Sequence, residues 1–260
     1  MPEHKTALVL SAGGMFGAYQ AGAYRAIAEL APPDIVVGAS VGALNGWPIA
    51  GGCTPDHLIE RWLDPSAGAT LKLFPNHGWR NGWFDPAPLR AQAEEIWGRY
   101  EPRLPFGLVV VQLPRLNAHL VKHPDVTAAH LQATCSIPLF LPSVEIDGRR
   151  YLDGGLFEKL PIWAALEMGA TRIIAIDSLP NVGKWWLHLG INIAHAFKPR
   201  RVYPRNLDLT IIEPSETLGD ANDAVFWKRG NVERWVDLGT RDAVRALTSV
   251  SPLAHAPASE

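Results

Sequence analysis

The chain has 260 residues, a length that favours a single α/β or all-β domain with a full-sized core. Its 47% hydrophobic and 19% charged residues exclude a disordered or collagen-like chain, and no run of about 18 apolar residues is available to span a bilayer. The net charge of −2, from 24 basic and 26 acidic side chains, gives no basic field that would favour nucleic acid as a partner.

The first 50 residues contain the same unit twice: a short apolar strand, a glycine loop and a helix. Residues 6–11 are typical of a buried strand, and residues 18–30 carry apolar side chains at helical spacing. A second strand at 34–37 is followed by a helix rich in small residues at 41–50. The first apolar run is too short for a signal peptide, so we expect a cytoplasmic protein.

Later in the chain, strand and helix signals continue to alternate. Strands are predicted at residues 117–121, 172–177 and 207–213, with mixed strand and helix signals at 125–135. This alternation indicates βαβ crossovers, and hence an α/β fold with a mostly parallel sheet. Residues 65–105 combine three tryptophans with prolines and glycines, and we expect a long irregular excursion there that covers a site.

We expect residues 1–260 to form one domain with a frayed tail at 252–260. Residues 184–198 have an amphipathic helical pattern, which fits either packing into the core or a flap over a site. The ten tryptophans are expected mainly in the core, although tryptophan is also enriched where proteins meet membranes. The only cysteines, Cys53 and Cys135, have no metal-type spacing and suit a reducing compartment.

The sequence Gly38-Ala39-Ser40-Val41-Gly42 lies between the second predicted strand and the helix that follows it. A G-x-S-x-G sequence in this context is the pattern of a nucleophile elbow, in which the serine occupies a strained turn. Glycines are needed on both sides because a Cβ at either position would collide with the neighbouring chain. The helix after Ser40 directs its positive end at the serine and at any oxyanion beside it. Ser40 is therefore the candidate nucleophile.

Gly13, Gly14 and Gly17 form another glycine loop, between the first strand and its helix. Backbone N–H groups in such a loop can hold a phosphate or the oxyanion of a tetrahedral intermediate. A dinucleotide fingerprint requires G-x-G-x-x-G, which Ala12 interrupts, so nucleotide binding is the weaker interpretation.

A carboxylate directly precedes two glycines at Asp153-Gly154-Gly155. The glycines allow a sharp turn and the close approach of a ligand or of a second residue. The plainer interpretation is a turn aspartate, which is the commonest use of Asp-Gly. Each of the three motifs is weak alone, but their occurrence together in one chain is a strong signal.

The order of these motifs, a glycine loop after the first strand, G-x-S-x-G after the second and D-G-G much later, resembles the patatin-like lipid acyl hydrolases. The resemblance extends to residues 133–142, to Pro161 and to residues 238–243, and so covers residues 5–247. It implies a three-layer α/β sandwich in which helices flank a mostly parallel central sheet.

The resemblance also implies a Ser-Asp dyad without a catalytic histidine, in which Ser40 is the nucleophile and Asp153 is the general base. The N–H groups of Gly13, Gly14 and Met15 correspond to the family's oxyanion loop, and no metal or organic cofactor is required. A carboxylate is a weak base for a hydroxyl, so the dyad must be partly desolvated and the oxyanion strongly stabilised. The remaining motif glycines are Gly17, Gly38, Gly42, Gly154 and Gly155.

Three positions depart from the family pattern. Ala12 replaces the usual first glycine of the loop, so its φ must be negative or the position strained. Phe16 stands where a basic residue is common, which weakens the case for phospholipids over neutral esters. Lys159 stands where the family usually has asparagine.

Two other functions remain open: a Ser-His-Asp esterase of the α/β-hydrolase type, and a non-catalytic protein that binds a ligand or nucleotide with the Gly13-Gly14 loop. The esterase is disfavoured because its elbow normally follows several strands, and because no histidine after Asp153 has a recognisable setting. The expected partner is a lipid or small acyl ester, with transient contact to membrane surfaces. No nucleic-acid partner is expected, and the sequence indicates no oligomeric state.

Overall fold

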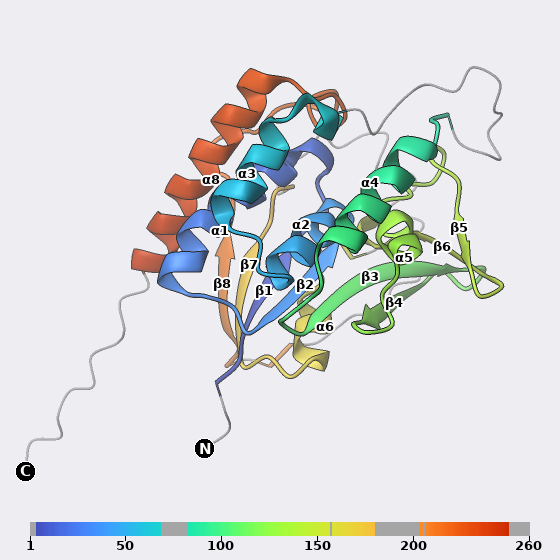
Figure 1. Ribbon diagram of the computed structural model, residues 1–260. Coiled ribbons are helices and arrows are strands. Elements are labelled where there is room, and N and C mark those ends of the chain that lie inside the picture. The colour runs from blue at the N-terminus through green and yellow to red at the C-terminus, as the bar shows by residue number, and fades with distance from the viewer. Residues whose placement is uncertain (1–3, 69–82, 157, 180–202, 205, 250–260) are drawn as a thin grey trace, which may run out of the picture.

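The computed structural model describes residues 4–68, 83–156, 158–179, 203–204 and 206–249. The described strands are β1 (Thr6–Leu10), β2 (Ile35–Ala39), β3 (Phe106–Leu113), β4 (Asn117–Lys122), β5 (Val144–Ile146), β6 (Arg149–Asp153), β7 (Arg172–Ile176) and β8 (Asp208–Ile212). They form one sheet in the order β5-β6-β3-β2-β1-β7-β8, with β4 also paired to β3 (Figure 1). The predicted tail and the amphipathic pattern at 184–198 lie outside the described residues.

The sheet has a parallel part and an antiparallel part. The strands β3, β2, β1, β7 and β8 are parallel neighbours, as the βαβ pattern predicts. In contrast, β4 and β6 run antiparallel to β3, and β5 runs antiparallel to β6. The predicted α/β fold is confirmed, with a mixed sheet whose parallel strands run from β3 to the edge at β8 and whose antiparallel strands lie at the other end.

The described helices are α1 (Gly17–Leu30), α2 (Val41–Ala50), α3 (Pro55–Leu63), α4 (Ala87–Arg99), α5 (Ala128–Ala133), α6 (Ile162–Glu167) and α8 (Arg229–Ser249), with 3-10 turns η1 (Gly14–Phe16), η2 (Pro65–Gly68) and η3 (Gly154–Leu156). Helices α1 and α8 pack side by side (Figure 1). A Cβ at Gly22 would lie 2.0 Å from the carbonyl oxygen of Val236, and one at Gly239 would lie 2.1 Å from that of Tyr19. These two glycines therefore allow the helices to meet backbone to backbone.

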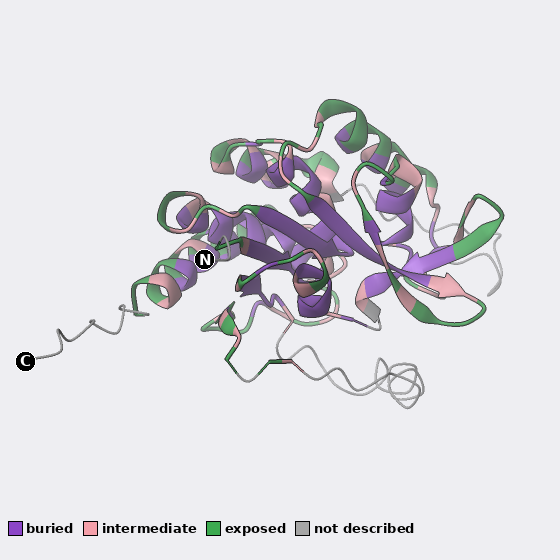
Figure 2. Cartoon of the chain, turned by 90° about the horizontal axis from the view of Figure 1, so that it is seen from below, coloured by how far each residue is buried: buried purple, intermediate pink, exposed green. Residues whose placement is uncertain are grey.

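Two hydrophobic cores lie on opposite faces of the sheet, because successive strand residues point to opposite sides. Leu8 and Leu10 of β1 belong to the larger core, which includes residues of α1, α2, α3 and α8. Ala7 and Val9 belong to the smaller core, which α6 covers with Trp163 and its neighbours. Figure 2 shows the consequence: the central strands are buried, and the helices expose their outer sides.

The first two strand and helix units lie where the sequence predicts them, and the helix at 41–50 coincides with α2. The prediction of an irregular excursion at 65–105 is wrong for α4, whose Leu89, Ala93 and Ile96 are buried at helical spacing. Strand β3, which follows that region, escaped prediction. Its apolar run is continuous and lacks the alternation that marks a half-buried strand.

The tryptophans in the described ranges differ in burial. Of those in the described ranges, the core prediction is confirmed for Trp47, Trp62, Trp163 and Trp235, which are at most 8% exposed. By contrast, Trp83 and Trp97 are 56% and 45% exposed, so the prediction is wrong for these two.

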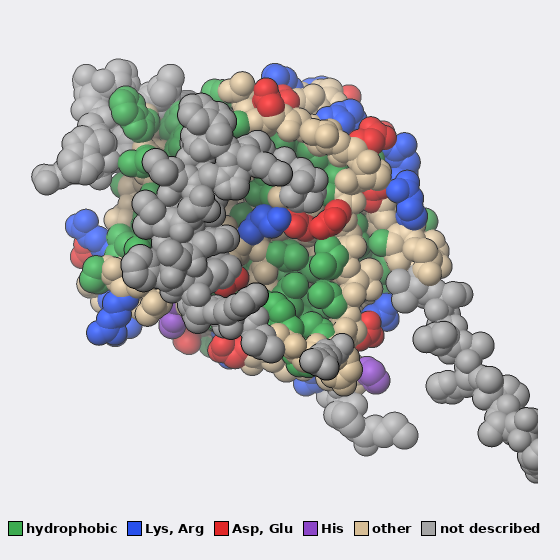
Figure 3. Space-filling view, turned by 180° about the vertical axis from the view of Figure 1, so that it is seen from behind, with side chains coloured by type: hydrophobic (Ala, Val, Ile, Leu, Met, Phe, Trp, Pro, Cys, Tyr) green, Lys and Arg blue, Asp and Glu red, His purple; other side chains and the backbone are tan. Residues whose placement is uncertain are grey.

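The surface charge is mixed. On the face shown in Figure 3, basic and acidic side chains are interspersed around a group of hydrophobic side chains. In the described part of the chain, no helix is both long and apolar enough to cross a membrane. The same described residues contain no group of three or more His, Cys, Asp or Glu side chains placed to hold a metal ion.

Candidate active site

Strands β2 and β6 lie end to end along the same edge of β3. Ala39 at the end of β2 pairs with Val109, and Asp153 at the end of β6 pairs with the next residue, Val110, while β4 occupies the other edge. Because β2 is parallel and β6 antiparallel to β3, the carboxyl ends of the two strands face each other. The topology thereby brings Ser40 beside Asp153, although 113 positions separate them in the sequence.

The turn at Ser40 has the strained backbone of an elbow. Ser40 has φ 54° and ψ −131°, a conformation that costs a non-glycine residue about 1–3 kcal/mol. A Cβ at Gly38 would lie 2.4 Å from the backbone of Gly42, and one at Gly42 would lie 2.4 Å from the carbonyl oxygen of Leu10. The serine therefore lies in the turn between β2 and α2, at a point where only glycines fit on either side.

The hydroxyl of Ser40 donates a hydrogen bond to the Asp153 carboxylate, with 2.8 Å between Oγ and Oδ2. The other carboxylate oxygen, Oδ1, accepts the N–H of Gly155 at 2.6 Å. Ser40 and Asp153 are 6% and 3% exposed. Ser40 is also the N-cap of α2, but its side chain makes no capping bond, so the hydroxyl points at the carboxylate instead. The arrangement suits proton transfer from the hydroxyl to Asp153.

The Gly13-Gly14 loop lies at the end of β1, next to β2 in the sheet. Its N–H groups are not equivalent: the N–H of Met15 donates to the carbonyl of Ala224 at 2.9 Å. No acceptor for the N–H groups of Gly13 and Gly14 is found among the residues that the structure describes. Of the three predicted oxyanion donors, Met15 is thus occupied, whereas the N–H groups of the two glycines are not used by any residue in the described ranges.

The first residue of this loop, Ala12, packs against the turn that follows Asp153. A Cβ at Gly155 would lie only 2.2 Å from the Cβ of Ala12, whose own φ is not positive. The N–H of Ala12 donates to the carbonyl of Lys159 at 2.9 Å. Alanine is therefore accommodated without strain, and Gly155 leaves the room that its methyl group occupies.

Lys159 also ties this turn to the end of β7. Its Nζ lies 2.6 Å from Oδ2 of Asp177 and donates to the carbonyl of Leu179 at 3.0 Å. The Asp177 side chain is 8% exposed, so its charge is matched by a lysine where the family usually has asparagine.

A hydrogen-bond network of buried amides and hydroxyls packs against the Gly13-Gly14 loop. Gln20 donates to the carbonyl of Ser11 at 2.7 Å and lies 3.2 Å from the hydroxyl of Ser178. Asn45 donates to Gln20 at 3.0 Å and accepts the indole N–H of Trp62 at 2.9 Å. This network connects the end of β1 with α1, α2 and α3. Because its polar groups are bonded to one another, it holds the backbone at the start of the glycine loop in place.

Phe16, the position where a basic residue is common, is fully buried. Its ring meets that of Trp235 edge to face, with centroids 5.1 Å apart. The aromatic residue therefore fills the core between the loop and α8, and does not face a bound anion.

Cys135 lies beside the pair. Burial and the Asp153 carboxylate raise the pKa of the Cys135 thiol well above its ordinary value, while a hydrogen bond with Ser40 lowers it. Sequence reasoning did not single out this cysteine, because nothing local places it near an elbow 95 residues earlier in the chain.

Three histidines in the described part of the chain have side-chain partners other than Ser40 and Asp153. The rings of His57, His123 and His130 interact with Glu60, Glu101 and Thr127, respectively. Burial lowers the pKa of His130. The histidines that the esterase alternative would draw on after Asp153 lie outside the described residues.

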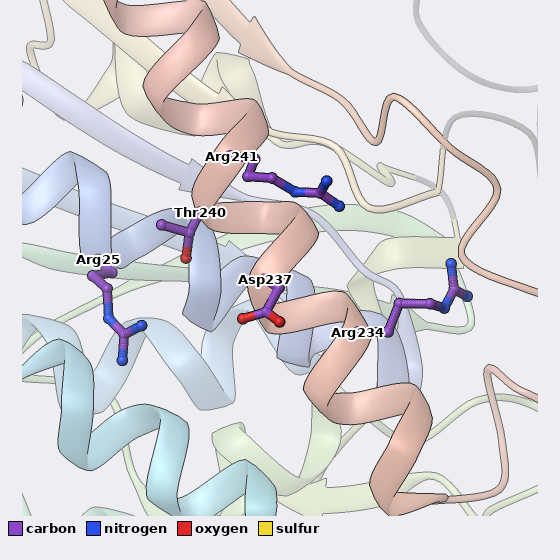
Figure 4. A pocket seen from close by; sticks show the side chains of 5 residues that line it. All are labelled: Arg25, Arg234, Asp237, Thr240 and Arg241. Atoms are coloured by element: carbon purple, nitrogen blue, oxygen red, sulfur yellow. The ribbon is translucent and has the colours of Figure 1, made fainter.

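A separate surface pocket of about 630 Å³ lies over α1 and α8 and does not include Ser40 or Asp153 (Figure 4). It is lined by Arg25, Arg234, Asp237, Thr240 and Arg241. Arg25 pairs with Asp56 at 2.8 Å, and Arg234 donates to the carbonyl of Leu218. These two guanidinium groups already have partners within the fold, so we do not consider the pocket a second candidate active site.

Comparisons with known proteins agree with this architecture. A model of the patatin-like phospholipase family matches residues 8–166. The chain is 27% identical over 208 residues to patatin-like phospholipase domain-containing protein 7 of Rattus norvegicus, and 29% identical over 213 residues to that of Mus musculus. Each match covers 70% of this chain and 15% of the relative, so the chain corresponds to a small part of these curated relatives.

Among solved structures, VipD from Legionella pneumophila superimposes with a TM-score of 0.55 at 13% identity, covering 95% of this chain and 67% of that one. At this identity the likeness concerns the fold alone. The family match, by contrast, spans more than half of the chain and contains the glycine loop, the Ser40 elbow and Asp153. The chain belongs to the patatin-like phospholipase family.

Proposed function

We propose that this chain is a serine acyl hydrolase that cleaves carboxylic ester bonds of lipids. The observation that carries the proposal is the 2.8 Å hydrogen bond from the Ser40 hydroxyl to the Asp153 carboxylate, between two buried side chains at a strained elbow. Membership of a family named for phospholipases supports an ester of a lipid as the substrate.

In the proposed reaction, Oγ of Ser40 attacks the ester carbonyl carbon while its proton passes to Asp153. The oxyanion of the tetrahedral intermediate is stabilised by the N–H groups of Gly13 and Gly14 and by the positive end of α2. Collapse of the intermediate expels the alcohol, which takes the proton from Asp153, and leaves the acyl group on Ser40. Water then attacks the acyl-enzyme with Asp153 again as base, releasing the acid and restoring the serine.

Exposed apolar side chains support contact with a lipid surface. Leu139 is 62% and Trp83 is 56% exposed, and the N–H of Trp83 donates to the carbonyl of Leu139 at 3.1 Å. Below them, the small core around Phe84 includes Cys135, which lies beside Ser40. A lipid that meets these side chains is therefore close to the nucleophile.

Labelling with a fluorophosphonate probe, together with hydrolysis of a panel of p-nitrophenyl esters and phospholipids, tests the proposal. We expect the wild-type protein to be labelled and to release acyl groups, and Ser40→Ala to do neither. A wild-type protein that is not labelled would support the non-catalytic alternative. A single His→Ala variant as inactive as Ser40→Ala would replace the dyad with a triad.

A further inference from the structure

We propose that Thr134 is a positioning residue that holds the Ser40 elbow through the serine's backbone N–H. This inference rests on the proposed function and adds a residue to it. Thr134 follows α5, and its side chain is fully buried. The backbone N–H of Ser40 lies 2.9 Å from Oγ1 of Thr134, and Oγ1 lies 2.7 Å from the carbonyl oxygen of Val109.

The direction of both hydrogen bonds is fixed by their partners. A backbone N–H can only donate and a carbonyl oxygen can only accept. The Thr134 hydroxyl must therefore accept from Ser40 and donate its single proton to Val109. Since Val109 pairs with Ala39 in the sheet, the threonine connects the elbow to β3 at the point where β2 ends.

Thr134 supplies a constraint that the elbow otherwise lacks. The carbonyl of Ser40 accepts the N–H of Ala43 at 2.8 Å, which fixes the side of the serine that faces α2. The N–H side has left the sheet ladder, because β2 ends at Ala39. A strained backbone conformation persists only where several surrounding contacts hold it in place. The Thr134 hydroxyl is the contact that holds the N–H side of Ser40.

The same short segment also holds Asp153. Two residues after Thr134, the carbonyl of Ser136 accepts the N–H of Asp153 at 3.1 Å. Residues 134–136 therefore contact the backbone of the proposed nucleophile on one side and that of the proposed base on the other. Loss of the Thr134 hydroxyl would release Ser40 relative to a carboxylate that stays in place.

A positioning role predicts a particular kinetic change. Thr134 is buried and does not reach substrate, so its loss should lower kcat and leave KM nearly unchanged. Misplacing a reacting group by about 1 Å costs on the order of 10²-fold in rate. We therefore expect Thr134→Val to lower kcat at least about 10-fold, with KM changed less than about 3-fold. Thr134→Ser keeps the hydroxyl and should stay within about 3-fold of wild type in both constants.

Thr240→Val is the matched control. Its hydroxyl is part-buried between α1 and α8, and lies within hydrogen-bond distance of two backbone carbonyl oxygens, those of Gly22 and Val236. We expect this variant to lower the melting temperature without changing kcat.

The experiment measures kcat, KM, melting temperature and the rate of fluorophosphonate labelling for wild type and the three variants. A selective loss of kcat and labelling rate in Thr134→Val, rescued in Thr134→Ser, supports the inference. Wild-type rates in Thr134→Val, or an equal loss of kcat in Thr240→Val, would overturn it while the proposed function stands. If Thr134→Val does not fold, a loss of more than about 10-fold in folded Thr134→Ser would also overturn it. A wild-type protein that takes no label overturns the proposed function, and this inference with it.

Discussion

The two glycine loops at the carboxyl ends of β1 and β2 differ in how completely their polar groups are bonded. At the elbow, the N–H, the carbonyl and the hydroxyl of Ser40 all have partners. In the neighbouring loop, the N–H groups of Gly13 and Gly14 have no acceptor among the described residues.

This difference fits the two parts that the loops would have in the proposed reaction. A nucleophile must be aimed before substrate arrives, so each of its bonds to the fold lowers the cost of reaching the reactive geometry. An oxyanion donor must stay unpaired until charge develops on the substrate. The loop that carries it must therefore be held in place by other polar groups. The network of Gln20 and Asn45 provides that support without using the donors.

The largest expected effect tests the elbow. Ser40→Ala and Asp153→Asn should each lower kcat for ester hydrolysis by about 10³-fold or more, because general-base catalysis and the nucleophile act as one unit. The double variant should be little worse than either single variant. The measurement is kcat for the three proteins, with circular dichroism as the control for folding. Wild-type turnover in Asp153→Asn would show that the hydrogen bond at 2.8 Å is not part of the chemistry.

Alanine substitutions compare the two loops directly. In Gly42→Ala the new Cβ meets the carbonyl oxygens of Leu10 and Ser11 at 2.4 and 2.6 Å, which are backbone atoms of a buried strand end. We expect a loss of about 3 kcal/mol or more in the free energy of unfolding. In Gly13→Ala the nearest atom is the Ser178 hydroxyl at 2.5 Å, a side-chain atom that can move only by giving up its buried hydrogen bonds with Ser11 and Gln20.

Gly13→Ala should therefore cost about 1–2 kcal/mol of stability, less than Gly42→Ala, but about 10-fold or more in kcat, since it displaces a proposed oxyanion donor. Denaturant unfolding and steady-state kinetics on both variants separate the two outcomes. A Gly13→Ala protein with full kcat would remove this N–H group from the proposed mechanism.

Phe16→Arg tests whether the residue at the end of the glycine loop belongs to the hydrophobic core. The substitution places a charge in the core against Trp235, and we expect a loss of about 3–5 kcal/mol in the free energy of unfolding. Phe16→Leu, as the control, should cost about 1 kcal/mol, because it keeps an apolar side chain there. An arginine variant as stable as the leucine variant would mean that the side chain leaves the core. Only in that case would this position bear on the choice between phospholipid and neutral ester.

The sequence predicts the local parts of this site well and the long-range parts poorly. The Ser40 elbow and the Gly13-Gly14 loop follow from glycine sterics within a few residues, and both occur where the motifs place them. Thr134 escaped notice because its partner is 94 positions away, and no local pattern marks a hydroxyl that caps a distant N–H. The burial of Phe16 was also not predictable locally, because its contact, Trp235, comes from the last described helix.

The smallest expected effect concerns Cys135, a half-buried cysteine beside Ser40 and Asp153. Because burial and the Asp153 carboxylate raise the pKa of this thiol, it stays protonated at pH 8, and the protonated form is not the nucleophile. Iodoacetamide at pH 8 should therefore leave the hydrolytic activity of the native protein unchanged, and peptide mapping should find Cys135 unmodified until denaturant is added. In Asp153→Asn one cause of the raised pKa is gone, so the thiolate fraction and the rate of alkylation should both rise. Rapid alkylation of native wild type, at the rate of a free thiol, would mean that the Asp153 carboxylate does not keep this half-buried thiol protonated.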